Sequence, residues 1–181
     1  MQTYVKSFLT VALVSATAVA GSAYAADVMG TKTIGAYRVE LHVLQAEPFF
    51  SKEDVAVKHI KEGMEVQGGA TPVMQDAASR PNHHLVVHIF GKKTRQAITD
   101  ATIAMRYVPL DRKGIPTGAP VEVPVVVMQA IGKGPSSTHY GNNVTMPAGR
   151  CQVTVIVNGE TAVFGITASD ASSTPMRHMK M

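Results

Sequence analysis

The stretch Cys151-Gln-Val-Thr-Val-Ile-Val-Asn-Gly-Glu-Thr-Ala-Val-Phe-Gly-Ile-Thr167 decides the fold class, because apolar and polar residues alternate along it in two runs. Side chains of a β-strand point alternately to its two faces, so alternation predicts a strand with one buried face. The Asn-Gly pair at 158–159 favours a type I′ turn, in which both residues have positive φ. We therefore expect a β-hairpin whose return strand runs over 161–167. Three valines share one face of its first strand: Val153, Val155 and Val157.

Four other segments have the same alternation and are predicted to be strands. In the first of them, Val39, Leu41 and Val43 share the buried face and His42 lies on the opposite face. In the last, Pro124 lacks an N–H and argues for an edge position or a bulge. Short strands separated by turn residues are typical of an all-β fold, a single antiparallel immunoglobulin-like β-sandwich. The four segments are 37–44, 84–90, 101–108 and 121–128.

Three segments lack this alternation. Ser51 with Asp54 offers a helix-capping signal, which predicts one or two helical turns within 51–61. Residues 62–82 are rich in Gly, Pro and polar groups and are expected to form a long loop. Residues 168–181 read as a flexible tail that contains Met and His.

The N-terminal residues read as a secretory signal peptide. Lys6 precedes an apolar run over 8–20, and Ala23-Tyr24-Ala25 has the form of a cleavage site. The run is short for a transmembrane helix, and no other stretch is long enough for one. We therefore expect export to the periplasm, cleavage after Ala25, and a β-sandwich domain over 26–167.

Composition excludes several classes of function. The net charge is only +4 and its basic residues are spread along the chain, so nucleic-acid binding is not indicated. Cys151 is the one cysteine, which excludes an intramolecular disulfide and favours a buried strand residue. No G-x-S-x-G, H-E-x-x-H or C-x-x-C motif is present. We therefore do not expect an enzyme.

Histidine and methionine are the residues that suggest metal chemistry, because imidazole and thioether ligands suit copper. His84 and His88 would share one strand face with Cα atoms about 13 Å apart, so at most one should belong to a given centre. Met128 and His139 could meet at one edge of the sandwich, where a strand ends and a loop follows. The alternatives are two solvated strand histidines, a core methionine and an ordinary loop histidine.

The chain also resembles the periplasmic iron-transport protein family, copper-containing β-sandwich proteins that work beside a ferrous-iron permease. His139-Tyr-Gly-Asn-Asn-Val-x-Met146 is similar to that family's H-Y-G-x-N-I-x-M signature. The run His84-Leu-Val-Val-His-Ile-Phe90 resembles its H-L-E-A-D-I-H strand, and 102–107 resembles its T-I-x-Y strand. The resemblance covers roughly residues 83–167.

The resemblance implies metal ligands at His84, Met128 and His139. The family's strand glutamate falls on Val86 and its aspartate on His88, so the carboxylates are lost. The family's later histidine has no counterpart in the tight hairpin, and His178 in the tail could replace it. Losing carboxylates favours copper, especially Cu(I), over iron.

These features together predict a periplasmic copper-binding protein that acts in Fe(II) uptake, with iron as a second candidate ion. The resemblance implies an inner-membrane ferrous-iron permease as partner and a homodimer. Two other functions stay open: a copper-handling or copper-tolerance binder unconnected with iron, and a metal-free periplasmic interaction module.

Overall fold

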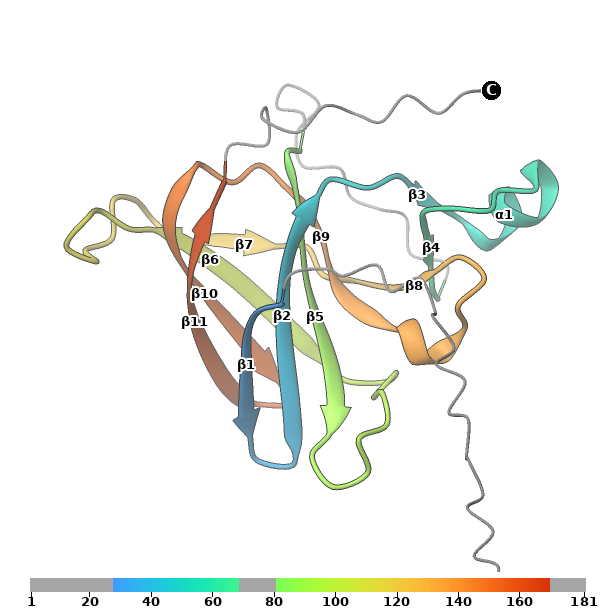
Figure 1. Ribbon diagram of the computed structural model, residues 1–181, viewed down its shortest axis with the longest axis horizontal. Coiled ribbons are helices and arrows are strands. Elements are labelled where there is room, and N and C mark those ends of the chain that lie inside the picture. The colour runs from blue at the N-terminus through green and yellow to red at the C-terminus, as the bar shows by residue number, and fades with distance from the viewer. Residues whose placement is uncertain (1–27, 69–80, 170–181) are drawn as a thin grey trace, which may run out of the picture.

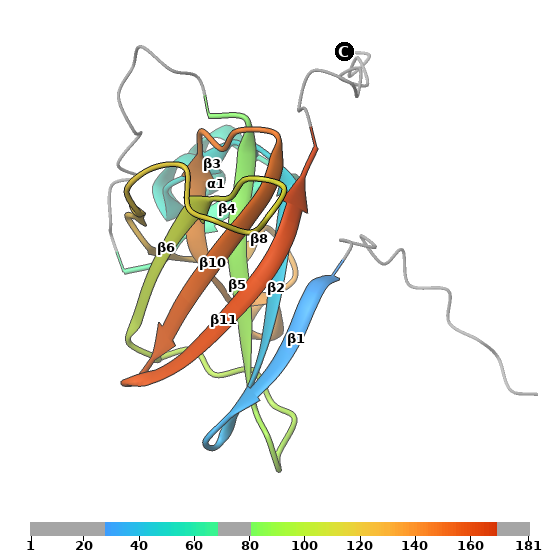
Figure 2. The same cartoon turned by 90° about the vertical axis from the view of Figure 1, so that its left-hand side faces the viewer.

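The computed structural model describes residues 28–68 and 81–169, and these form two β-sheets packed face to face (Figures 1 and 2). The larger sheet holds, in spatial order, β1 (Val28–Ile34), β2 (Tyr37–Gln45), β5 (His83–Gly91), β9 (His139–Val144), β8 (Val126–Ala130), β4 (Met64–Val66) and β3 (Phe49–Phe50). The smaller sheet holds β11 (Glu160–Ala168), β10 (Gly149–Val157), β6 (Ile103–Pro109) and β7 (Val121–Val123). The prediction of an all-β fold is confirmed.

The predicted hairpin is present as β10 and β11, which pair in an antiparallel register from Gly149 opposite Ala168 to Val157 opposite Glu160. The turn residues Asn158 and Gly159 have φ of 48° and 89°, as a type I′ turn requires. The sheets are antiparallel throughout except where β3 and β4 pair in parallel.

The main core lies between the two sheets and includes apolar residues that alternation predicted, together with Tyr140, Val144 and Met146, which it did not predict. Val39 and Leu41 of β2 are completely buried, as are the inward-facing residues of β5 and β10. Burying each such aliphatic side chain stabilises the fold by about 1.5–3 kcal/mol. Cys151 is a free, buried strand residue, as predicted.

The single strand predicted over 121–128 is wrong, because the chain changes sheet in its middle. Residues before Pro124 form β7 of the smaller sheet, and residues from Val126 onward form β8 of the larger one. Pro124 cannot donate a ladder hydrogen bond, which favours a break here. Its carbonyl oxygen instead accepts a hydrogen bond of 2.6 Å from Nδ2 of Asn142.

The loop predicted over 62–82 is wrong in part, because Met64–Val66 forms β4, and β1 and β3 were not predicted. The helical segment is confirmed as α1 (Lys52–Lys58), whose N-cap Ser51 accepts a hydrogen bond from the Asp54 amide. No helix within 28–68 and 81–169 is long and apolar enough to cross a membrane. The predicted signal peptide and residues 170–181, including His178, lie outside the described residues.

His139 was expected to lie in a loop, and this expectation is wrong, because the segment from His139 to Val144 is a strand. It forms β9, a strand between β5 and β8 in which all six residues are buried. The strand has no apolar alternation in its sequence. Its polar asparagine side chains can nevertheless be buried, because they hydrogen-bond to backbone groups far away in the chain. Asn142 contacts Pro124, and Asn143 contacts Glu47.

Candidate metal centre

The predicted ligands meet on the outer face of the larger sheet, away from the core between the sheets. His84 and His88 lie on β5, His139 on β9 and Met128 on β8. Strand β9 runs between β5 and β8 (Figure 1). His139 is therefore flanked by the strand that carries His84 and His88 and by the strand that carries Met128. The site therefore lies in the interior of the sheet surface, and the prediction of an edge site is wrong.

Gly141 allows the two histidine-bearing strands to come close. It pairs with Val86 on β5, and a Cβ atom at Gly141 would clash with the carbonyl oxygen of Leu85 and lie 2.8 Å from Cα of Val86. Gly141 therefore adds no side chain of its own between His84 and His139 on this face. Their ring centroids are 5.6 Å apart, with the rings perpendicular.

A hydrogen bond fixes the tautomer of His84. Its Nδ1 lies 3.0 Å from Oδ1 of Asn143. The Asn143 amide is oriented by Glu47, whose backbone N–H donates to Oδ1 at 3.2 Å and whose carbonyl accepts from Nδ2 at 2.7 Å. Oδ1 is therefore an acceptor, so we assign the His84 proton to Nδ1. The lone pair of neutral His84 is then on Nε2.

His139 has the same arrangement. Its Nδ1 lies 2.9 Å from the carbonyl oxygen of Ser137, which can only accept, so Nδ1 carries the proton. Nε2 of His139 and Nε2 of His84 are both buried with no hydrogen-bond partner among the described residues. Leaving such an atom unpaired costs about 1–3 kcal/mol. Metal-binding histidines commonly donate their other N–H to a carbonyl or carboxylate oxygen, which fixes the metal-binding nitrogen.

The surroundings keep the imidazoles neutral. Burial, with repulsion from His139, lowers the pKa of His84 to about 3, although the Asn143 hydrogen bond opposes the shift. Burial, with repulsion from His139 and His42, lowers the pKa of His88 to about 3, against a hydrogen bond to the Thr138 backbone. Burial likewise lowers the pKa of His139. Neutral rings keep their lone pairs for a metal ion.

Apolar side chains surround the position between His84 and Met128. Met128 is completely buried and belongs to a small apolar cluster on this face of the sheet. The ring of Phe49 of β3 packs against the His84 ring at an interplanar angle of 64°, with centroids 5.5 Å apart. The cluster contains Val66, Val86, Val126 and Met128, with Phe49 and Met64 packed against it.

The group of histidines also includes His42, which was not a predicted ligand. The His88 ring lies 5.2 Å from the His139 ring and 4.9 Å from the His42 ring, centroid to centroid. Sequence reasoning placed His42 on the polar strand face but gave it no role, and it did not single out Met64. The interpretation of His84 as solvated is wrong, since its exposed fraction is 0%.

Within residues 28–68 and 81–169, no three His, Cys, Asp or Glu side chains converge as a ready-made metal-binding group. The His139 ring contacts both the His84 ring and the His88 ring. The set formed by His84, His139 and Met128 contains only two imidazoles, and its third donor is a thioether. His178 lies outside the described residues.

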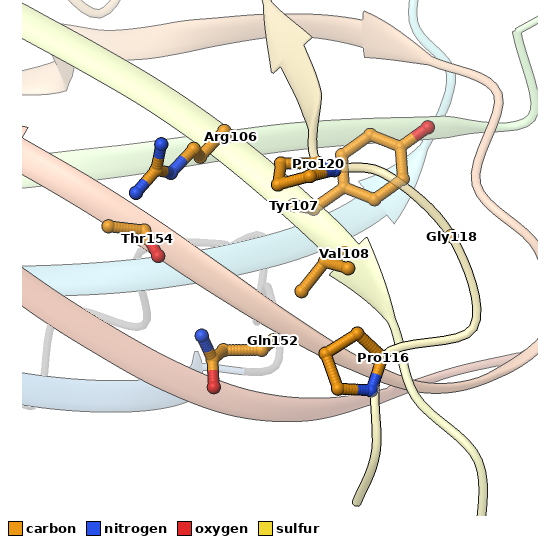
Figure 3. A pocket seen from close by; sticks show the side chains of 8 residues that line it. All are labelled: Arg106, Tyr107, Val108, Pro116, Gly118, Pro120, Gln152 and Thr154. Atoms are coloured by element: carbon orange, nitrogen blue, oxygen red, sulfur yellow. The ribbon is translucent and has the colours of Figure 1, made fainter.

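A separate hollow of about 260 Å³ lies on the other sheet and contains no histidine (Figure 3). Arg106, Gln152 and Thr154 reach it from β6 and β10, and Pro116 and Pro120 border it. Its donors are unlike those of the histidine cluster.

Comparisons with family models, curated proteins and solved structures find no match to this chain. The resemblance to the iron-transport family therefore depends on the short motifs quoted above.

Proposed function

We propose that this protein binds one copper ion, preferentially Cu(I), through His84, His139 and Met128. The observation that carries the proposal is the pair of buried Nε2 atoms without partners, on rings whose centroids are 5.6 Å apart. Two imidazoles that share one ion through bonds of 2.0–2.1 Å have centroids roughly 5–6 Å apart. The observed separation therefore fits a shared ion.

The donor set favours copper over iron. Two neutral imidazoles and a thioether are borderline and soft ligands, whereas Fe(II) and Mn(II) prefer sites that include carboxylates. Val86 occupies the position where a carboxylate would face this site, and its neighbours Val126 and Val66 are apolar. An apolar enclosure penalises a higher charge, so a monovalent ion is favoured over a divalent one.

The proposed role is capture and delivery of the metal, without covalent catalysis. The resemblance supports a connection with Fe(II) uptake beside an inner-membrane permease, and a dimeric assembly. An immunoglobulin-like arrangement of the sandwich, a cleaved leader over residues 1–25 and a location in the periplasm belong to the same proposal.

Competition of the whole chain with a chromogenic Cu(I) chelator tests the proposal. We expect His139→Ala and His84→Gln each to weaken Cu(I) binding by more than about tenfold, since even changes around metal ligands cost that much. His59→Gln is the control, because His59 is exposed and follows α1, far from β9 in the fold (Figure 1). Unchanged Cu(I) affinity in His139→Ala would overturn the proposal.

A further inference from the structure

Three donor residues hold neighbouring positions on β2 and β5, on the β1-proximal side of the same sheet face. Glu40 of β2 is the direct cross-strand partner of His88 on β5. His42 is two residues from Glu40 on the same strand, so both side chains project to the same face. The His42 and His88 rings meet edge to face, with centroids 4.9 Å apart. From this arrangement we propose a second metal site, formed by Glu40, His42 and His88, for a divalent ion of borderline character.

The chemistry of the three donors sets the kind of ion. Two imidazoles with one carboxylate are a common ligand set for Zn(II) and for non-haem Fe(II). The carboxylate supplies a negative charge that His84, His139 and Met128 lack. The second site therefore prefers divalent ions. It shares no residue with the copper site, so either site can exist without the other.

Solvent can reach this second site. His88 is partly exposed, and the Glu40 side chain is 18% exposed. His42 is buried beneath them, with an exposed fraction of 6%. An ion from solution would therefore meet Glu40 and His88 first and His42 last.

Arg38 competes with a metal ion for the Glu40 carboxylate. Its guanidinium is ion-paired with Glu40, which neutralises the carboxylate. Arg38 also lies over the ring of Phe90, with 4.3 Å between Cζ and the ring centroid. A cation–π contact of this kind holds the guanidinium over the ring independently of Glu40. Arg38 can therefore release Glu40 and stay over the Phe90 ring, while the divalent ion replaces it in neutralising the Glu40 carboxylate.

Titration of the whole chain with Co(II), followed by visible absorption, and with Zn(II), followed by calorimetry, tests the second site. We expect Glu40→Gln and His42→Gln each to weaken binding of both ions by more than about tenfold. Arg38→Met is expected to tighten it, because the competing cation is removed. Glu40 is partly exposed, so Glu40→Gln should fold even if His42→Gln does not.

Two further variants separate this site from the copper site and from the tail. Met128→Leu and His178→Ala should each bind Co(II) as the unmodified chain does. The proposal is overturned if the unmodified chain takes up no Co(II) or Zn(II), or if Glu40→Gln binds them with unchanged affinity. Loss of Co(II) binding in Met128→Leu would also overturn it, since the ion would then occupy the copper site.

Discussion

Met128 and His139 are direct cross-strand partners on β8 and β9. Residues directly opposite in an antiparallel pair project to the same side, with Cβ atoms about 4.5–5.5 Å apart. The chain returns between them through a short turn that includes the 3-10 helix η1 (Pro135–Ser137). The register of two strands therefore fixes the thioether beside the imidazole.

Replacing Met128 by leucine separates metal binding from packing. Leucine is close in volume, so we expect the free energy of unfolding to change by less than about 1.5 kcal/mol. Cu(I) affinity should fall by more than about tenfold, because the thioether is lost. Met146→Leu is the matched control, since Met146 is equally buried but packs in the core between the sheets. Equal Cu(I) affinities of the two variants would contradict the role of Met128.

Asn143 is expected to act through His84 and to contribute no bond to the metal. Asn143→Ala removes the acceptor for His84 Nδ1 and both bonds to the Glu47 backbone. We expect Cu(I) affinity to fall about 10–100-fold and stability to fall by about 1–3 kcal/mol. Asn143→Asp keeps an acceptor oxygen and should recover much of the affinity. Chelator competition and thermal unfolding measure both effects, and an Asp variant as weak as the Ala variant would exclude this role.

Gly141→Ala tests the close approach of β9 to β5. The added Cβ would clash with the Leu85 carbonyl and lie 2.8 Å from Val86 Cα, and these backbone atoms cannot move freely. We expect a loss of more than about 2 kcal/mol in the free energy of unfolding, measured with denaturant. Gly165→Ala on β11 is the control, because no atom lies within 4 Å of its added Cβ. Similar losses for the two variants would show that the approach is not tight.

The metal-free protein should lose stability as the pH falls below about 6.5, the ordinary pKa of an unfolded-state histidine. The folded-state pKa of His84 is about 3. Above pH 6.5 the ring is neutral in both states, so its contribution to stability is complete. Between pH 6.5 and 3 only the unfolded chain takes up the proton, which stabilises the unfolded state by about 1.4 kcal/mol per pH unit.

Denaturant unfolding at a series of pH values measures this slope. Replacing His84 by Gln should make the slope shallower. A slope that is the same in the His84 variant and the unmodified chain would show that His84 protonates in the folded state.

Much of the fold could be predicted from local patterns. Alternation in β2, β5, β6 and the β10–β11 hairpin places one apolar face between the sheets, and short-range chemistry defines the Asn158-Gly159 turn and the Ser51 cap. These features depend on residues close together in sequence. The strands β1, β3 and β4 were missed, since their apolar residues are few or lie in very short runs.

The candidate metal site was harder to predict, because the positions of its side chains depend on residues that are far away in the sequence. The six residues of β9 have no apolar alternation, and Asn143 is held by Glu47, which lies 96 positions away. Valine-rich 121–128 has the composition of one strand, yet Pro124 divides it between two sheets. Met128 and His139 were singled out together from the sequence, but their direct pairing in adjacent strands required the register.

X-ray absorption at the copper edge of the Cu(I)-loaded chain tests the central claim most directly. The proposed site predicts two imidazole nitrogens and one thioether sulfur around copper, with the sulfur signal absent in Met128→Leu and retained in Met146→Leu. A spectrum of the unmodified chain without a sulfur neighbour, or a sulfur signal that survives in Met128→Leu, would contradict the account.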